Sequence, residues 1–488
     1  PGNLNLGPGD VVQIRGGSYT SVFDRFYVYG QGTANQPIFI SGIGATTAPV
    51  LNKKVHFPNA QYVIIEGVKI QNAAIEFRPL ADEIEIHHNA VRYTELAGPG
   101  TFNGGGSFMA DNTYYNTPIH DIVFYKNVGH DMGQWDAPIE NDISVFSIQQ
   151  KVHNAWIIDN VGYHSGGDGV ILAHGANYNT HHIYIGRNHF YQNRENGIDL
   201  KQANDVIVSE NVLHNHRPTS SSAGECLVIH YDPERIWILN NNVHDCNIGL
   251  TTTGSLTTYF IGNLLHNIHH SGTTTYNPSS AYSEGAAIHA RNANLHAIGN
   301  TIYDYDTGIQ IPQAFANTEI VNNIFSNRAE PLAYDILVTG GVANAEMNYN
   351  LFDITSTSTR IGWSNTVALN LTSFQSAYGP KGANALEGNA GFTDVGSANF
   401  TLTSSSDAKN TGVASAAYQT FYNLYGIDIS KDFKGNTRPQ GTAWDIGAYE
   451  SSSGIPPACT ENWSCTAWST CSVAGSQTRT CTDLNSCG

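Results

Sequence analysis

The sequence predicts an all-β protein built as a solenoid of parallel coils, and two observations lead to this fold class. The first is composition: the 488 residues include 48 glycines and 25 tyrosines but only three methionines, which suits strands and turns better than helices. The second is a register of asparagines, each with apolar residues five and three positions before it and usually another two positions after it. The register comprises Asn89, Asn127, Asn160, Asn188, Asn211, Asn241, Asn263, Asn300, Asn323 and Asn350.

The spacing of these asparagines, 22 to 38 residues, matches one coil of a β-solenoid with loops of variable length at its corners. Asparagine tolerates left-handed backbone angles, and its amide can hydrogen-bond along the stack to the equivalent asparagine one coil away. We therefore expect every asparagine of the register to mark the same bend.

Residues 183–211 illustrate one complete coil of the pattern. Apolar and polar residues alternate with period two, so one set should face the core and the other should project from the opposite face. On this basis Asp199 and Lys201 should be exposed together. The positions predicted to be buried in this coil are Ile198, Leu200, Val206 and Val208.

Charge and cysteine content limit the partners and the compartment. The net charge of −18 argues against nucleic acid as a partner, and no apolar run is long enough to span a bilayer. Cysteines crowd the last thirty residues, which predicts a disulfide-stapled module and an extracellular or cell-surface location. These cysteines are Cys459, Cys465, Cys471, Cys481 and Cys487. The remaining two, Cys226 and Cys246, fall on adjacent coils, where they either pair or lie too far apart along the strand direction.

Two segments of the chain resemble those of a known superfamily. The opening GDVVQIRGGSY at 9–19, and DFKGNTRP at 432–439 followed by DIGAYE at 445–450, resemble the entry and closing segments of secreted, carbohydrate-active, right-handed parallel β-helix proteins. The resemblance implies one right-handed β-helix over residues 1–450. Its members include lyases, hydrolases, epimerases and structural rods, so the resemblance alone does not choose among these functions.

The C-terminal region has a different character. A Ser- and Pro-containing linker at 451–458 leads to a cysteine-rich module at 459–488 that resembles part of a thrombospondin type 1 repeat. The resemblance implies a stack of Trp463, Trp468 and Arg479, with disulfides replacing a core. Such modules normally carry six cysteines, and this one has five. We expect the module to act as a spacer or attachment unit.

The candidate catalytic residues cluster near the start of equivalent strands on adjacent coils. They are Asp168, Glu195, Asp199, Lys201, Glu225 and His230. If Gly197 and Cys226 are structurally equivalent, His230 lies directly above Lys201. The alternative interpretation is an ordinary solvated face, because outward strand positions are polar in any case.

Calcium-dependent pectate lyases of the β-helix type supply roles for this cluster by resemblance. They imply that Asp168, Glu195 and Asp199 are Ca²⁺ ligands and that Lys201 is the base, with a pKa lowered enough to take a proton. His230 lies beside the base. The substrate's negative charge would be steadied by Arg217 or Arg235.

A second set of residues lies three positions after the register asparagine. It comprises His130, Tyr163, Tyr191, His214, His244, His266 and Tyr303. Three consecutive imidazoles, His214, His244 and His266, should stack at the inter-strand spacing. They form either a side-chain ladder or a site for a transition metal, which needs ligands that converge on a point.

Two functions of different class follow from these features. The first is an extracellular lyase that cleaves an acidic, uronic-acid polysaccharide by calcium-assisted β-elimination, favoured by Asp199 and Lys201 beside His230. The second is a non-catalytic surface rod, adhesin or filament subunit that self-assembles or attaches through the C-terminal module. The net charge of −18 and the incomplete module favour this alternative.

Overall fold

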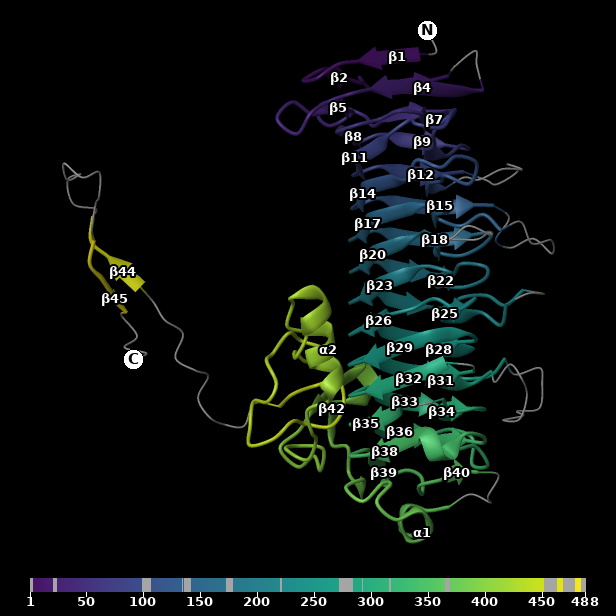
Figure 1. Ribbon diagram of the computed structural model, residues 1–488, viewed down its shortest axis with the longest axis vertical. Coiled ribbons are helices and arrows are strands. Elements are labelled where there is room, and N and C mark those ends of the chain that lie inside the picture. The colour runs from purple at the N-terminus through teal and green to yellow at the C-terminus, as the bar shows by residue number, and fades with distance from the viewer. Residues whose placement is uncertain are drawn as a thin grey trace.

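The computed structural model describes residues 3–20, 24–98, 107–133, 135, 142–172, 179–219, 222–271, 284–291, 293–315, 317–364, 369–451, 463–467 and 479–483. In this part of the chain, successive coils stack into a long rod with three parallel sheets, here named A, B and C (Figure 1). Each coil from β1 to β39 contributes one strand to each sheet, and the described residues of these coils contain no α-helix. The predicted all-β parallel solenoid is therefore confirmed.

Sheet A holds fourteen strands. They are β1 (Asn3–Leu6), β4 (Arg25–Gly30), β7 (Lys54–Phe57), β10 (Ile75–Phe77), β13 (Phe108–Ala110), β16 (Phe146–Ile148), β19 (Val170–Leu172), β22 (Ile198–Lys201), β25 (Glu225–His230), β28 (Ile248–Thr252), β31 (Ala286–Ala290), β34 (Thr307–Ile311), β37 (Ile336–Val338) and β40 (Ile361–Trp363).

Sheet B holds thirteen strands. They are β2 (Val11–Gln13), β5 (Ile38–Ser41), β8 (Val63–Glu66), β11 (Ile86–Arg92), β14 (Ile119–Tyr125), β17 (Val152–Ile158), β20 (His181–Gly186), β23 (Asn204–Ser209), β26 (Ile236–Leu239), β29 (Ser255–Ile261), β32 (Ala293–Ile298), β35 (Thr318–Val321) and β38 (Ala345–Asn348).

Sheet C holds fourteen strands. They are β3 (Gly17–Tyr19), β6 (Pro49–Leu51), β9 (Lys69–Gln71), β12 (Glu95–Ala97), β15 (Val128–Met132), β18 (Val161–Ser165), β21 (His189–Tyr191), β24 (Val212–His214), β27 (Asn242–Cys246), β30 (Leu264–Ile268), β33 (Thr301–Tyr305), β36 (Ile324–Arg328), β39 (Leu351–Asp353) and β41 (Leu386–Gly388).

The core runs along the axis of the rod, between the three sheets. Period-two alternation directs the apolar residues of each strand inward, where they meet like residues of the next coil. Phe57 stacks on Phe77 and Phe108 on Phe146, both pairs with ring centroids 4.9 Å apart. The inward positions predicted for the coil at 183–211 are confirmed as fully buried: Ile198, Leu200, Val206 and Val208.

The asparagine ladder is confirmed from Asn127 to Asn350. At each step the side-chain oxygen of one asparagine accepts hydrogen bonds from the backbone and side-chain N–H groups of the asparagine one coil earlier. Asn188, for example, donates from N and from Nδ2 to Oδ1 of Asn211, both at 2.9 Å. Asn211 Nδ2 in turn donates to the carbonyl of Ile185 at 3.0 Å. Both amide groups are thus satisfied inside the rod, where an unpaired polar group would be costly.

Two details of the predicted register are wrong. The left-handed residue of each bend is the one before the asparagine, such as Asp159 at φ 56°. Asn89 lies outside the ladder, because it pairs with the core position Ile122 of the next coil. There its Oδ1 accepts from the backbone N–H of Val63 at 2.9 Å. The ladder position of that coil belongs to Thr94, whose N–H donates to Asn127 Oδ1.

The ladder occupies the corner between sheets B and C, and this corner has a fixed length. Two residues separate the strands at every such corner from β8 to β39. The corners on both flanks of sheet A vary instead, from a single residue, 247, between β27 and β28 to the long segment 269–285 between β30 and β31. The outer face of sheet A therefore lies between two rows of connections of unequal length.

The chain after β40 closes the far end and returns along the rod. It contains helix α1 (Leu371–Tyr378), the hairpin β42 (Phe392–Asp394) and β43 (Asn399–Leu402), the 3-10 turn η2 (Val395–Ser397) and helix α2 (Ala416–Tyr425). Another 3-10 turn, η1 (Val342–Asn344), lies earlier in the chain, just before β38. The Ser415 side chain caps α2 by accepting from the N–H of Ala417. Phe421 of α2 packs edge-on against Trp237 on the outside of sheet B, and Figure 1 shows α2 alongside the coils.

The closing segment that follows α2 is held by a buried ion pair. Arg438 Nη1 lies 3.2 Å from Glu450 Oε2, and both side chains are almost fully buried. Arg438 also donates to the carbonyl oxygens of Asp445 and Gly447, which offsets the cost of burying its charge. The backbone N–H of Ala448 donates to Thr301 Oγ1, so the segment is attached to the coils.

The described part of the tail is an antiparallel pair, β44 (Trp463–Cys465) and β45 (Cys481–Asp483). A disulfide joins Cys465 to Cys481, which agrees with the predicted small disulfide-rich module. Trp468 and the other tail cysteines, Cys459, Cys471 and Cys487, lie outside the described residues. No helix among the described residues has the length and apolarity needed to cross a membrane.

Candidate functional site

The candidate catalytic cluster lies on the outer face of sheet A. Strand β22 pairs with β25 so that Asp199 lies opposite Val228 and Lys201 opposite His230. The predicted register between these two coils is thus correct. Asp199 points outward as the alternation predicts, but the expectation that it is exposed is wrong: only 2% of the residue is accessible. The cause is that two long side chains, Lys201 and His230, cover its carboxylate.

The Asp199 carboxylate is shared by two cationic or potentially cationic groups. Lys201 Nζ lies 2.8 Å from Oδ2, and His230 Nε2 lies 2.6 Å from Oδ1. Lys201 and His230 are each about a fifth exposed, at 16% and 24% of their side chains. Short charge-assisted bonds of this kind fix the positions of both donors. The arrangement therefore presents an amine and an imidazole side by side, at the edge of solvent.

The pKa of Lys201 is raised above its ordinary value. Burial alone would lower it, but the charge of Asp199, the hydrogen bond to Asp199 and the more distant charges of Asp168 and Glu195 outweigh burial. The sequence-based expectation of a lowered lysine pKa is therefore wrong for the free protein. Lys201 carries its proton at neutral pH, which favours a role as a fixed positive charge over that of a base.

Asp168 occupies the turn before β19 and is fully buried. Its Oδ1 accepts hydrogen bonds from Asn196 N at 3.2 Å and from Asn196 Nδ2 at 2.9 Å. Burial, followed by the negative charge of Asp199, raises the pKa of Asp168 well above its usual range. Asp168 is thus held toward the neutral acid form, which limits the negative charge behind the site.

The two glutamates of the cluster lie at the corner between sheets C and A. Glu225 is buried and accepts from Ser222 Oγ at 2.7 Å and from the N–H of Ala223 at 3.0 Å. Burial raises the pKa of Glu225. Glu195 accepts from Thr219 Oγ1 at 3.4 Å. These contacts give Glu225 a role in fixing the corner rather than in reaching a ligand.

These carboxyl groups do not fit a calcium site as they are arranged. Carboxylate oxygen is the ligand type that Ca²⁺ prefers, but Asp199 is already bonded to Lys201 and His230, and Asp168 is buried and held toward its neutral form. Among the described residues, Asp168, Glu195 and Asp199 do not form a group whose oxygens converge closely enough to share an ion. In this arrangement the three carboxyl groups therefore do not make up the predicted ligand set.

The two arginines predicted to steady the substrate lie in different places. Arg217 lies at the same corner as Glu195, where its backbone N–H donates to Asn193 O at 2.8 Å and its Nη1 donates to Trp135 O at 3.3 Å. Arg235 directly precedes β26 of sheet B and has a left-handed φ of 58°. There it holds Asp205 through two hydrogen bonds of 2.6 and 2.8 Å. The charge of Arg235 is thus engaged by Asp205 at the start of sheet B, and a role in steadying a substrate beside Lys201 stays a prediction.

A buried histidine in the same region escaped sequence analysis. His216 lies against Gly197, where a methyl group added to the glycine would come within 2.6 Å of its Nε2. Within the part of the chain that the structure describes, neither ring nitrogen of His216 has a hydrogen-bond partner. Burial, with smaller contributions from His214 and His244, lowers the pKa of His216 to about 3. Close packing thus requires a glycine at position 197, directly before β22, and only the fold reveals this relationship.

The column of rings after the asparagine ladder is confirmed as a stack. The ring centroids of His214 and His244 are 4.6 Å apart, and those of His244 and His266 are 4.8 Å apart. The rings lie in a line on sheet C and do not form one of the converging ligand groups found among the described residues. This supports the side-chain ladder over the metal site.

The question of the two solenoid cysteines is also resolved. Cys226 and Cys246 form a disulfide with a Cα–Cα distance of 5.9 Å. Cys226 is the second residue of β25, the strand that carries His230, and Cys246 ends β27 on sheet C. The bond therefore ties the site-bearing strand to the neighbouring coil across the corner.

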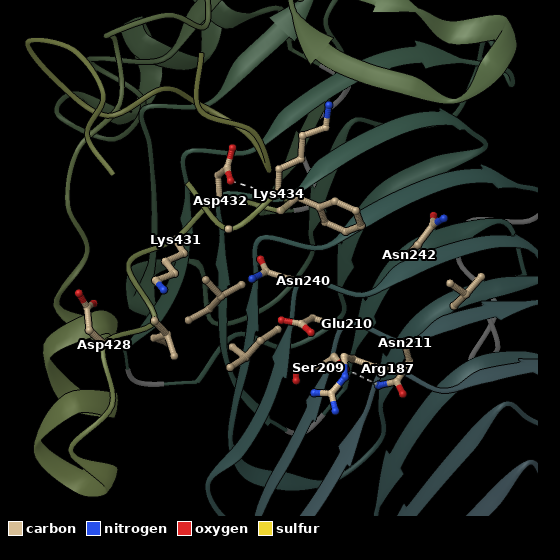
Figure 2. A pocket seen from close by; sticks show the side chains of 16 residues that line it. Arg187, Ser209, Glu210, Asn211, Asn240, Asn242, Asp428, Lys431, Asp432 and Lys434 are labelled. Carbon is tan, nitrogen blue, oxygen red and sulfur yellow. Dashed lines mark hydrogen bonds between the residues drawn. The ribbon is translucent and has the colours of Figure 1, made fainter. Parts of the chain in front are cut away.

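A separate cavity of about 630 Å³ lies between the coils and the segment after α2. Figure 2 shows Arg187, Glu210 and Asn240 on the coils, with Asp428, Lys431 and Lys434 on the facing segment. None of the residues around Asp199 lines it. The cavity is at the corner between sheets B and C, so it is distinct from the site on sheet A.

Comparison with known proteins agrees with the fold. A family model described as a right-handed beta helix region matches residues 175–353, and together with the three parallel sheets it defines a right-handed parallel β-helix protein. No curated protein matches the chain.

Several solved structures are similar. The A-module of Azotobacter vinelandii mannuronan C-5 epimerase AlgE4 is 17% identical, with a TM-score of 0.36 over 67% of this chain and 90% of that chain. Pectate lyase Pel9A is 13% identical, with a TM-score of 0.38 over 92% and 88%. A mannuronic acid specific polysaccharide family 6 lyase from human gut microbiota is 13% identical, with a TM-score of 0.37 over 71% and 82%. Likeness at this level does not assign chemistry to this chain.

Proposed function

We propose that the outer face of sheet A around Asp199 binds an acidic polysaccharide and cleaves it by β-elimination. The observation that carries the proposal is the single carboxylate of Asp199 held between Lys201 Nζ and His230 Nε2. This arrangement supplies a fixed positive charge and an imidazole within reach of one sugar unit. The surrounding connections vary in length on both flanks of the face, which suits the binding of a long chain between them.

β-Elimination on a uronic acid begins with removal of the proton from the carbon that bears the carboxylate. The electron pair left behind forms a double bond to the neighbouring carbon, whose bond to the glycosidic oxygen breaks. In the proposed mechanism Lys201, which carries its proton, neutralises the substrate carboxylate as negative charge develops on it. His230 accepts the proton, and Asp199 stabilises the imidazolium that forms.

The leaving glycosidic oxygen must then take up a proton, and His230 can return the one it accepted. Asp168, in its neutral form, avoids repulsion between the wall of the site and the anionic sugar. The alternative assigned from the sequence makes Lys201 itself the base. Its raised pKa in the free protein weighs against this assignment, and the pH dependence of turnover separates the two.

The calcium-assisted form of the reaction is the second version of this proposal. It would require Asp199 to release Lys201 and His230, and Asp168 to lose its proton in a buried position. Turnover of the purified protein after treatment with a chelator distinguishes the versions. Unchanged turnover supports the Lys201 and His230 mechanism, and complete loss restored by Ca²⁺ supports the metal-assisted one.

The experiment that tests the function is incubation of the purified chain with pectate, alginate and a glycosaminoglycan. β-Elimination leaves an unsaturated sugar that absorbs ultraviolet light, so release of such ends by the wild type but not by His230→Gln confirms the proposal. Absence of product from all three polymers, together with assembly of the protein into ordered polymers, would establish the structural rod instead. The C-terminal module is proposed as a thrombospondin-like attachment unit in either case.

A further inference from the structure

A strip of histidines follows the outer face of sheet B, away from the sheet A site. Four consecutive coils place a polar pair at the start of their sheet B strands, between two buried residues. The pairs are His87 and His88 on β11, His120 and Asp121 on β14, His153 and Asn154 on β17, and His181 and His182 on β20. We refer to these eight residues as the histidine strip.

A repeated backbone kink brings both members of each pair to the surface. The second residue of every pair has a left-handed φ, between 51° and 56°. In a regular strand successive side chains alternate between faces, so without the kink one member of each pair would point into the core. Asparagine, aspartate and histidine are the residues that adopt this conformation most readily apart from glycine. The kink thus creates two rows of side chains that run side by side along the rod.

The first row is a stack of four imidazoles. Ring centroids are 5.1 Å apart for His87 and His120, 5.0 Å for His120 and His153, and 4.9 Å for His153 and His181, with interplanar angles of 13°, 4° and 5°. These distances reproduce the spacing between coils. A single stack would offer ligands only in a line.

The second row consists of the left-handed residues, and two of them, His88 and Asp121, converge with His120 of the first row. His88 Nε2 lies 3.5 Å from Asp121 Oδ2, and His120 Nδ1 lies 2.7 Å from the same oxygen. One ligand atom from each of His88, His120 and Asp121 falls within 4.8 Å of the others. Two imidazoles and one carboxylate from two adjacent coils therefore face a common point, which the His214 column does not achieve.

Neighbouring rings hold His88 in place. Tyr62 stacks on it with ring centroids 4.6 Å apart, and the Nδ1 atoms of His87 and His88 are 2.9 Å apart, within hydrogen-bond distance. Fixing Nδ1 in this way leaves Nε2 directed toward Asp121, which is the type of outer contact that orients histidine ligands in metal sites. The His88 side chain is 44% exposed, so an ion can enter directly from solvent.

We propose that His88, His120 and Asp121 bind a divalent transition-metal ion, with zinc as the reference ion. Imidazole nitrogen with one carboxylate oxygen is a ligand set that zinc and its neighbours in the transition series accept, whereas calcium and magnesium prefer oxygen alone. Three protein ligands leave the remaining position open to water. The site is independent of the proposed function, since it lies on another sheet and shares no residue with the Asp199 cluster.

The test is calorimetric titration of the chelator-treated full chain with zinc chloride. The wild type should bind one more equivalent of zinc than the double variant His88→Ala/His120→Ala. Asp121→Asn should lower the zinc affinity of that site by at least about ten-fold. His214→Ala removes a stacked imidazole that belongs to no group of three converging ligands among the described residues, so this variant should bind zinc as the wild type does. Melting curves establish that each variant is folded.

Two results would overturn the assignment. One is a wild type that takes up no zinc, and the other is a double variant that binds with unchanged stoichiometry and affinity. Cobalt(II), which takes the same ligands, gives a second readout, because its visible absorption changes on binding. A cobalt spectrum identical in the wild type and Asp121→Asn would also contradict the proposal.

Discussion

Lys201 lies directly opposite His230 in the pairing of β22 with β25, and both side chains meet the same Asp199 carboxylate. A short hydrogen bond to a different oxygen of Asp199 fixes the rotamer of each side chain. The pair therefore behaves as one preorganised unit, and removing either member should affect chemistry more than folding.

Replacing Lys201 with methionine should lower turnover on the cleaved polysaccharide by about 10²- to 10⁴-fold, the usual contribution of one positioned group. Lys201→Arg keeps the positive charge and should retain more activity than Lys201→Met, whereas a lysine acting as base would lose activity in both. Initial rates from ultraviolet absorbance measure the effect. Lys126→Ala, at an exposed position on the corner between sheets B and C, is the control and should be fully active.

Replacing Asn211 with alanine should destabilise the rod strongly. The change removes the acceptor of two hydrogen bonds from Asn188 and the donor to Ile185 and Asn241. Each buried group left without a partner costs about 1–3 kcal/mol, so we expect a loss of several kcal/mol in denaturant unfolding. Asn294→Ala, at a position outside the ladder, should cost little. Equal losses in the two variants would contradict the role given to the ladder.

Acid should destabilise the solenoid from about pH 6.5 downward. Burial lowers the pKa of His216 from 6.5 to about 3 and that of His266 to about 4. A histidine whose pKa is lower in the folded state than in the unfolded state favours folding most at a pH above its unfolded-state pKa of 6.5. This contribution is lost as the pH falls toward the folded-state pKa. For His216 it amounts to roughly 5 kcal/mol, at about 1.4 kcal/mol per unit.

The variant His216→Leu tests this assignment. Leucine removes the buried imidazole, which takes up a proton when the protein unfolds in acid. The melting temperature of this variant should therefore fall less between pH 7 and pH 4 than that of the wild type. His182→Leu, which changes an exposed ring, should follow the wild type. If all three proteins lose stability in parallel, the acid sensitivity belongs to other groups.

Deleting the chain after Ser453 should leave the rod folded. The tail has its own disulfide between Cys465 and Cys481. The closing segment that ends with Glu450 is held together by Arg438 and attached to the coils through Thr301. The truncated protein should therefore melt at the same temperature as the full chain. A truncated protein that melts several degrees lower would show that the boundary proposed near residue 451 is misplaced.

The fold could be predicted because its determinants are periodic. The ladder from Asn127 to Asn350 and the buried positions around Ile198 follow from local spacing, and the structure agrees with them. Asn89 was assigned to the ladder wrongly. It occupies an inward position of β11, and period-two alternation there places apolar residues at the same distances before and after it as at the ladder asparagines. Spacing alone does not reveal that its amide pairs with Val63 and Ala60 instead.

The site could be predicted only in part, since charge and burial depend on neighbours from other coils. The alignment of Lys201 with His230 required one register assumption, which is correct. The raised pKa of Lys201 and the burial of Asp199 depend on side chains packing over each other, and the ion pair of Arg235 with Asp205 joins residues thirty positions apart in the sequence. The histidine strip left a trace in the sequence, namely polar pairs such as His87 and His88 before an apolar run, which period-two alternation does not explain.

The fixed corner between sheets B and C restricts where this chain can grow. One added residue there would move an asparagine out of line with its neighbours and interrupt a continuous series of amide contacts. Added residues on either flank of sheet A leave that series untouched. Inserted segments are therefore best tolerated beside the face that carries Lys201, so the rim of the proposed site can diversify while the scaffold stays constant. The same two flanks are the places to graft new loops in engineering this rod.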